Sequence, residues 1–263
     1  MNANSDHILS LMYHDVVESG DLASSGFSGG DADRYKLEAK AFSRQLAIIQ
    51  DCGMRAGTIE QALSEPLLSL VLTFDDGGVG ALDAADCMEK FGYIGYFFVT
   101  TQRIGQSRFL SSSQMRDLSN RGHVIGSHSA SHPQRMASLP ADTISAEWQQ
   151  SLDTLQDSLG SSVDVASVPG GYYSPQLGEL AFKCGIQTLF TSEPERRVHK
   201  SNGLTTLGRY TVLNSTGDDG IKSLVTGSRF SRQKQYLNWN ARKMLKRAAG
   251  PWYDTVRRRI LSR

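Results

Sequence analysis

The chain has 263 residues, of which 39% are hydrophobic and 21% are charged, and its formal net charge is +1. This composition is typical of a soluble globular protein that buries its core without metal or disulfide staples. No stretch approaches the roughly 18 apolar residues of a membrane-spanning helix, and the small net charge by itself indicates no class of partner.

Short apolar runs alternate along the chain with helical patterns, which is typical of parallel β/α units. About seven such units predict a distorted or incomplete (β/α) barrel, with a flat doubly wound sheet as the main alternative. After the first strand, the Gly/Ser-rich stretch Gly20–Asp33 is expected to be a mobile surface loop. The expected strands are His7–Tyr13, Leu70–Phe74, Gly95–Val99, His123–Gly126, Val165–Val168, Gln187–Phe190 and Thr206–Val212. The expected helices are Ala41–Asp51, Gly80–Phe91, Ser113–Arg121, Ala141–Leu159 and Pro175–Cys184.

Polar or glycine-rich segments follow four of the expected strands. The first strand ends at His14 and the second at Asp75-Asp76, and two later strands continue into His128–His132 and Pro169–Tyr172. In parallel β/α architectures the C-terminal strand ends gather on one face, where catalytic residues lie. We therefore expect these four segments to share one site.

Two acids and two histidines in this set are typical of a metal site. Asp75 and Asp76 repel one another unless a cation or hydrogen bonds compensate, although a helix N-cap would also explain them. His128 and His132 are four residues apart, which can place both imidazoles on one ion, although either alone is more often a hydrogen-bonded loop residue. One carboxylate and two imidazoles make a three-ligand site with positions left for water and substrate.

Both motifs resemble those of the polysaccharide deacetylases, carbohydrate esterase family 4. Thr73–Gly77 matches the family's Thr-Phe-Asp-Asp-Gly motif, and His128–His132 matches its His-Ser-x-x-x-His motif, in the same order along the chain. Leu11–His14 is similar to the opening strand of members whose domain is circularly permuted. The resemblance extends over about residues 7–213.

The resemblance implies a role for each motif residue. Asp75 is the general base, while Asp76, His128 and His132 bind a divalent ion, for which zinc is the first choice. Such an ion polarises an acetamide carbonyl and lowers the pKa of a bound water, whose proton the base takes. A backbone N–H of the third motif is expected to face the oxyanion. The expected substrate-binding residues are Pro169, Gly170, Gly171, Tyr172 and Arg209.

Two positions depart from the family pattern. Many members have an Arg that orients the base two residues before the third-motif proline, where this chain has Ser167; Arg209 is a candidate substitute. Many members also take the general acid from a late His, and no His follows His199. The Tyr13-His14 opening resembles that of members whose acid comes from this first strand, so the resemblance implies His14 as the acid, with Asp15 as the carboxylate that keeps it protonated, unless His14 only closes its strand.

The implied function is metal-dependent removal of N-acetyl groups from N-acetylated amino sugars of a polysaccharide or its precursor. The main alternative is a sugar-binding protein without catalysis, because of the missing Arg and the missing late His. Another metal-dependent hydrolase of non-peptide C–N bonds also stays open. A non-haem iron oxygenase uses the same ligand types, but usually as His-x-Asp on an all-β scaffold.

The C-terminal segment differs in charge from the rest of the chain. Ten of the 28 Lys and Arg residues, but only one of the 27 acids, lie from Arg232 onward. The expected division is a catalytic domain, 1–230, and a basic helical extension, 231–263. The extension is either a helix pair packed on the barrel or an interfacial helix attracted to anionic lipid headgroups. A nucleic-acid partner is not expected, since no recognition motif accompanies the charge.

Cysteine use and the first residues together favour a reducing compartment. Cys52, Cys87 and Cys184 are widely spaced and lie in apolar helical patterns, which argues against disulfides. The chain as given starts without a basic segment followed by an apolar run. We therefore expect a cytoplasmic protein, peripheral to the membrane if its extension binds lipid.

Overall fold

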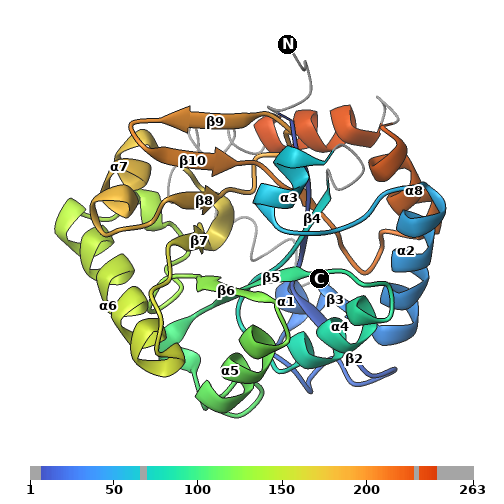
Figure 1. Cartoon of the computed structure of the whole chain (residues 1–263), viewed down its shortest axis with the longest axis horizontal. Coiled ribbons are helices and arrows are strands. Elements are labelled where there is room, and N and C mark those ends of the chain that lie inside the picture. The colour runs from blue at the N-terminus through green and yellow to red at the C-terminus, as the bar shows by residue number, and fades with distance from the viewer. Residues whose placement is uncertain (1–6, 66–69, 228–230, 242–263) are drawn as a thin grey trace.

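Nine strands form one curved sheet in the computed structural model of the chain, which describes residues 7–65, 70–227 and 231–241 (Figure 1). Their order is β11-β1-β4-β5-β6-β7-β8-β10-β9, and only β9 runs antiparallel to its neighbour. The strands are β1 (Leu9–Tyr13), β4 (Leu70–Phe74), β5 (Gly95–Val99), β6 (Val124–Ser127), β7 (Val165–Ser167), β8 (Thr188–Phe190), β9 (Val198–Ser201), β10 (Leu204–Leu207) and β11 (Tyr210–Thr211).

The sheet curls until strands from its two ends approach each other. β10 ends at Leu207, beside one edge of the sheet, and β11 begins at Tyr210, at the opposite edge. Three residue steps span at most about 11 Å, so these two strands are close in space although far apart in the hydrogen-bonded order. The sheet is therefore a distorted, incomplete (β/α) barrel, as predicted. We call the gap between β10 and β11 the seam; Gly208 and Arg209 cross it.

Helices cover the outside of the curved sheet (Figure 1). In α6, Ile144, Trp148 and Leu155 are buried at the spacing of one helix face, and the helix ends at Gly160, whose φ of 74° forms a left-handed cap. A separate two-stranded parallel sheet, β2 (Asp15–Val17) and β3 (Lys36–Glu38), lies beyond β1. The helices are α1 (Gly30–Asp33), α2 (Ala39–Asp51), α3 (Ile59–Ser64), α4 (Gly80–Glu89), α5 (Ser112–Asn120), α6 (Ala141–Leu159), α7 (Pro175–Lys183) and α8 (Asp218–Thr226), with 3-10 turns η2 (Thr101–Arg103), η3 (Met136–Ser138) and η4 (Pro169–Gly171).

Successive side chains of the central strands enter two different cores. On β5, Phe97 and Val99 pack with the helix-covered core, whereas Tyr96 and Phe98 belong to a cluster that includes residues of β4, β7, β8 and β10. This second cluster is the barrel interior, because its members come from strands around the curled sheet. Burial on both faces explains why these strands appear in the sequence as continuous apolar runs.

Most expected elements are confirmed to within two residues at each end, and the exceptions have physical causes. The single expected strand Thr206–Val212 is wrong, because the chain crosses the seam at residues 208–209 and divides into β10 and β11. The expected mobile loop Gly20–Asp33 is corrected as well. Ser25 and Gly26 are buried within it, and Gly30–Asp33 forms α1.

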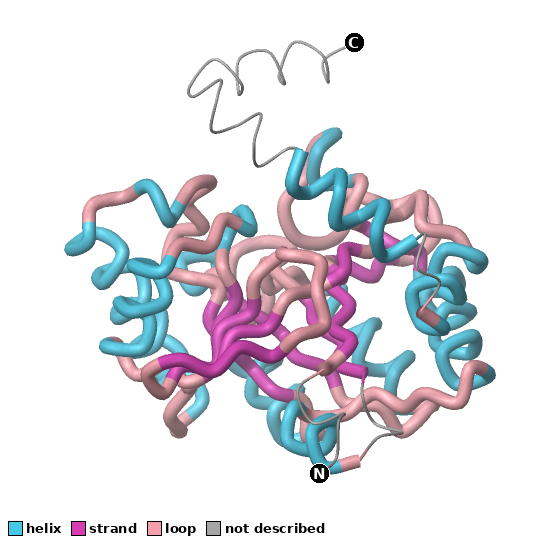
Figure 2. Tube along the Cα trace, turned by 90° about the horizontal axis from the view of Figure 1, so that it is seen from above, coloured by secondary structure: helices cyan, strands magenta, loops and turns pink. Residues whose placement is uncertain are grey.

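The described part of the C-terminal extension packs against the barrel. Residues 231–241 form a helix on the outside of the molecule (Figure 2). The Gln235 amide accepts from the Thr211 N–H at 3.1 Å and donates to the Thr211 carbonyl at 3.0 Å, and Arg232 donates to the Leu224 carbonyl at the end of α8. The packed-helix interpretation therefore holds for 231–241, whereas 242–263 lie outside the described residues.

Two further expectations concern cysteines and membrane spans. Cys52, Cys87 and Cys184 are free, as expected. Within the described ranges, no helix combines the length and the apolarity that crossing a membrane requires.

Candidate active site

The predicted site residues meet at the C-terminal end of the barrel. Asp75 and Asp76 directly follow β4, and His128 directly follows β6, with His132 in the turn beyond it. The C-terminal ends of β1 and β7 bring in His14 and Ser167. Because neighbouring parallel strands end side by side, residues more than 100 positions apart in the chain form one cluster.

Asp76, His128 and His132 form a compact triad. Their ligand atoms all lie within 4.8 Å of one another. The Asp76 Oδ1 atom is 3.5 Å from His128 Nε2 and 3.3 Å from His132 Nε2. Asp76 and His132 have φ angles of 79° and 61°, a left-handed conformation that non-glycine residues rarely adopt. Such backbone strain persists where the surrounding structure enforces it, commonly at functional sites.

The contacts of His128 fix which of its nitrogens faces the triad. Its Nδ1 lies 3.1 Å from the Ser167 carbonyl oxygen and 2.6 Å from the Ser167 hydroxyl. A carbonyl oxygen can only accept, so Nδ1 carries the proton and Nε2 presents its lone pair to the triad. Burial lowers the pKa of His128 to about 4, so the ring is neutral near pH 7, as a metal-binding imidazole must be.

The triad fits a divalent ion. Oδ1 of Asp76 is buried and has no hydrogen-bond partner among the described residues, which is costly for a carboxylate unless a cation completes the site. Burial raises the pKa of Asp76, but the imidazoles of His132, His14 and His128 outweigh it and hold this pKa well below its usual range. One carboxylate and two imidazoles are a donor set that zinc accepts in open sites.

Asp75 has the opposite surroundings, with every oxygen engaged. Arg209 donates from Nη1 to Oδ1 at 2.7 Å and from Nη2 to Oδ2 at 2.8 Å, and the Ser167 hydroxyl donates to Oδ1 at 3.1 Å. Burial alone raises the pKa of Asp75. The charge and the hydrogen bonds of Arg209 outweigh this effect, so the net pKa is lowered and the carboxylate is ionised.

Arg209 is itself fully buried at the seam. Its Nε donates to the Thr191 carbonyl and its Nη1 to the Thr73 hydroxyl. The guanidinium also lies over the rings of Phe98 and Phe190, 5.7 and 5.9 Å from their centroids. With no exposed surface, Arg209 cannot contact a saccharide directly. This geometry favours its predicted role as the substitute for the family's base-orienting Arg over its predicted role in substrate binding.

His14 lies beside the two acids but is not held by Asp15. Burial lowers the pKa of His14, while Asp76 and then Asp75 act to raise it. Its Nδ1 is buried without a hydrogen-bond partner among the described residues, and its ring packs at a tilt against that of Tyr35, with 4.3 Å between the centroids. Asp15 instead accepts a hydrogen bond from Ser25, so the expectation that Asp15 keeps His14 protonated is corrected.

The third motif forms a tight turn next to this cluster. Gly170 and Gly171 have φ angles of 65° and 74°, and a Cβ on Gly171 would lie 2.6 Å from the Ser192 hydroxyl and 3.0 Å from Trp239. Pro169 and Gly171 are buried, whereas Gly170 is exposed and Tyr172 is half-buried. Of the residues expected to bind substrate, these last two therefore have surface to offer.

Comparison with known proteins agrees with this arrangement. The family model for polysaccharide deacetylases matches residues 65–189, which include both acids, both histidines and the third motif. Residues 65–189 thus carry the sequence pattern of the polysaccharide deacetylase family. The resemblance inferred from the motifs is thereby confirmed, while the similarity of Leu11–His14 to a permuted opening strand stays a prediction.

Two curated relatives match this chain over part of their length. Bacillus subtilis YxkH, named for this family, is 27% identical over 192 residues, 70% of this chain and 64% of YxkH. A 30.6 kDa protein of Geobacillus stearothermophilus is 29% identical over 126 residues, 47% of this chain and 46% of that protein. The chain thus covers less than two thirds of the length of either relative.

Several solved structures share the fold. The Streptococcus pyogenes deacetylase PplD, in complex with acetate, has a TM-score of 0.66 at 23% identity, covering 81% of this chain and 95% of PplD. IcaB from Ammonifex degensii has a TM-score of 0.68 at 19% identity, covering 84% and 97%. A de-N-acetylase from Aggregatibacter actinomycetemcomitans has a TM-score of 0.66 at 17% identity, covering 83% and 100%.

Two aromatic side chains near the candidate site were not expected from the sequence. The Trp239 ring stacks on Tyr172 of the third motif, 6.2 Å between centroids, although it belongs to the extension. Phe27 lies 5.2 Å from the ring of His132. The sequence holds one signal for Phe27: it is a lone aromatic in a Gly/Ser-rich stretch. Trp239 follows no motif that would mark it.

Proposed function

We propose that the chain is a metal-dependent hydrolase that removes N-acetyl groups from N-acetylated amino sugars of a polysaccharide or its precursor. One observation carries the proposal. A three-ligand site lies one residue from a carboxylate, Asp75, that is buried, ionised and held by Arg209. The polysaccharide deacetylase domain supports the substrate class. Open ligand positions beside a separate base are what hydrolysis of an amide needs.

A bound divalent ion, with zinc as first choice, would polarise the acetamide carbonyl and supply a water of lowered pKa. Asp75 accepts the proton of the attacking water. Its Oδ2 receives a single N–H, from Arg209, and so keeps lone-pair capacity for that proton. The Arg209 fork fixes the carboxylate before the reaction begins, so the proton moves without rearrangement of the base.

His14 is the proposed donor of the proton that the departing amine requires. It occupies the same strand-end face as Asp75. Burial lowers the pKa of His14, and the charges of Asp76 and Asp75 oppose this lowering. A backbone N–H of the third motif, near Tyr172, is proposed to stabilise the oxyanion. Each role falls on a residue at a different strand end, as in other barrels of this architecture.

An acetate-release assay tests the proposal. The purified chain is incubated with N-acetylglucosamine oligomers and with bacterial polysaccharide precursors, with chelator and after readdition of zinc. We expect acetate release that chelator removes and zinc restores. Asp75→Asn serves as the inactive control. Tight zinc binding without acetate release from any of these substrates would refute the proposed hydrolase and favour a sugar-binding protein.

The sugar-binding alternative rested on the missing third-motif Arg and the missing late His. Arg209 weakens the first reason, because its guanidinium reaches the base from β11's side of the seam. His14 weakens the second in the same way. Another metal-dependent hydrolase of non-peptide C–N bonds would have the same site. Acetate release from the N-acetylated saccharides of the assay distinguishes the proposed deacetylase from such a hydrolase.

Two expectations stay predictions. Residues 242–263 lie outside the described residues, so attraction of the basic extension to anionic membrane surfaces rests on its sequence alone. Cytoplasmic placement likewise stays a prediction from cysteine use.

A further inference from the structure

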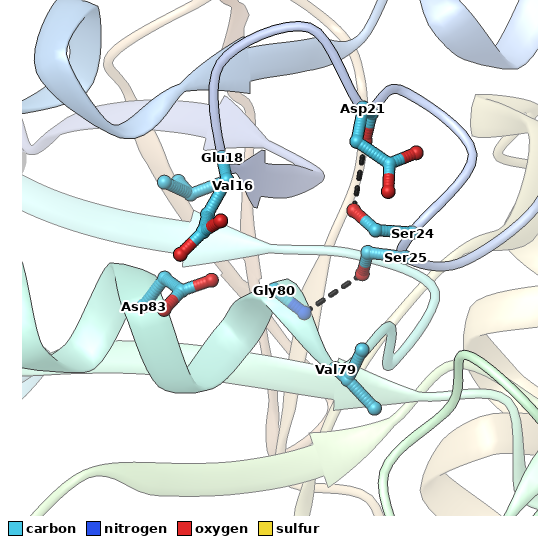
Figure 3. Close-up of a pocket in the computed structure, with 8 residues that line it drawn as sticks. All are labelled: Val16, Glu18, Asp21, Ser24, Ser25, Val79, Gly80 and Asp83. Carbon is cyan, nitrogen blue, oxygen red and sulfur yellow. Dashed lines mark hydrogen bonds between the residues drawn. The ribbon is translucent and has the colours of Figure 1, made fainter.

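Residues 18–29, which we call the strap, connect β2 to α1 and contact the metal triad at His132 through Phe27. The strap is anchored at Ser25. The Ser25 hydroxyl donates to Asp15 Oδ1 at 2.6 Å. It also accepts the Gly80 N–H at the start of α4 at 2.7 Å (Figure 3). The Lys36 ammonium, on β3, donates to the Ser25 carbonyl at 2.9 Å and also to the Leu22 carbonyl. The strap is thus tied to β2, β3 and α4 through one serine.

The anchor is buried, which makes it specific. Asp15, Ser25 and Lys36 are only 3%, 1% and 2% exposed. Buried polar groups of this kind are stable only when their hydrogen bonds are satisfied, so the strap has one favourable path at Ser25. Next to it, the Gly26 N–H donates to the Arg108 carbonyl at 2.9 Å. By contrast, a cavity of about 180 Å³ separates the first half of the strap from α4 (Figure 3).

The path set by Ser25 places Phe27 against the metal triad. The Phe27 ring lies 5.2 Å from the His132 ring, and Phe109 and the Arg103 guanidinium hold it on other sides at 5.2 and 5.3 Å. The His132 ring also packs against the His128 ring, with 5.0 Å between their centroids. His128 is oriented by hydrogen bonds to Ser167, whereas the orientation of His132 rests on ring packing and on Asp76.

We propose that Phe27 is a positioning residue that holds the His132 imidazole ready for the ion, and that Ser25 holds Phe27. The inference rests on the proposed function only in requiring that the triad binds a metal. Groups that orient metal ligands typically change metal affinity by about 10- to 100-fold when removed. Here the orienting contact is an aromatic ring rather than a hydrogen bond, and it comes from a segment with no family motif.

Zinc affinity of the purified full chain tests the inference, measured with zinc alone by competition against a chromophoric chelator. We expect Phe27→Ala to weaken affinity by roughly 10- to 100-fold. Phe27→Tyr keeps the ring and should restore wild-type affinity. Ser25→Ala should weaken affinity as well, although it changes no atom near the ion. Leu22→Ala, at an exposed side chain of the same strap, is the matched control and should bind as the wild type does.

Melting temperatures of the metal-free variants separate positioning from folding. If Phe27→Ala fails to fold, Ser25→Ala and Phe27→Leu carry the test. Wild-type affinity in Phe27→Ala, or an equal loss in Leu22→Ala, would overturn the inference while leaving the hydrolase proposal intact. A wild-type chain that binds no zinc would instead count against the metal-dependent function itself.

Discussion

Asp75 and Asp76 are adjacent in the sequence, yet the protein surrounds them in opposite ways. Asp75 is enclosed by its own chain, with both oxygens bonded to Arg209 and one also to Ser167. Asp76 keeps a buried oxygen without a hydrogen-bond partner among the described residues, aimed between two imidazoles. A carboxylate whose oxygens are all hydrogen-bonded by the chain, as in Asp75, is held in place for proton transfer. A carboxylate that keeps an oxygen without a hydrogen bond, as in Asp76, can bind a ligand.

Backbone geometry produces this difference. Asp75 still hydrogen-bonds through its N–H to the Tyr13 carbonyl, as the next residue of β4 would. Asp76 leaves the strand with φ at 79°, followed by Gly77 at 81°, and so turns its carboxylate toward β6 instead of the seam. Adjacent like charges are thereby tolerated, because each faces a different set of cationic or neutral partners.

The largest expected effects come from exchanging each carboxylate for its amide. Asp75→Asn should abolish turnover and retain zinc, because the base is lost and the triad is untouched. Asp76→Asn should lose turnover because zinc itself is lost, as should removal of either His128 or His132. Bound zinc is measured by elemental analysis beside acetate release. Full activity in Asp75→Asn would contradict the assignment of Asp75 as the base.

His14→Ala should lower turnover by roughly two to four orders of magnitude, with zinc content unchanged. The reason is loss of the proton donor to the departing amine. The loss should shrink for an aryl acetate, whose leaving group needs no proton. Equal losses on amide and aryl ester would show that His14 positions substrate or supports the fold, and that another residue is the acid.

The sequence predicted the parts of the site that lie in contiguous motifs. Asp76, His128 and His132 were assigned together from two short segments, and the structure brings their ligand atoms within 4.8 Å. Strands buried on both faces, such as Leu70–Phe74, were also placed correctly, since their apolar runs are unbroken.

Contacts across the seam could not be predicted with the same firmness. Arg209 lies 134 residues from Asp75, and its place depends on how far the sheet curls, which no local pattern encodes. The same closure broke the expected strand Thr206–Val212 in two. The prediction that Gly20–Asp33 is a mobile loop was wrong for a related reason. Its Gly and Ser residues are typical of a mobile loop, whereas the buried residues that fix Ser25, Asp15 and Lys36, lie outside the stretch.

Arg209→Gln should reduce stability by about 3–5 kcal/mol, because it leaves Asp75 as a buried charge without its main partner. The folded-state pKa of Asp75 lies below its unfolded value. The pair therefore contributes stability that is present above the unfolded pKa and is lost as the pH falls through the folded pKa. Urea unfolding at several pH values should show the gap between the two proteins narrowing toward acid. A gap that does not change with pH would argue against an ionised Asp75.

The smallest expected effect concerns the end of the chain. Deleting 242–263 should leave acetate release from soluble oligomers and the melting temperature unchanged, because residues 231–241 supply the contacts between the extension and the barrel that the described residues show. Deleting 231–263 should lower both: it removes the two Gln235 hydrogen bonds, each contributing about 1 kcal/mol, and the ring that stacks on Tyr172. The functional boundary would then lie near 242 instead of 231.

The shorter deletion also removes eight Lys and Arg residues, so vesicle binding separates the two roles of the extension. If the extension is attracted to anionic lipid, the 242–263 deletion should lose binding to anionic vesicles. On neutral vesicles, the deletion variant and the full chain should behave alike. Undiminished binding to anionic vesicles would remove the membrane role and leave 231–241 as a packed helix that supports the third motif.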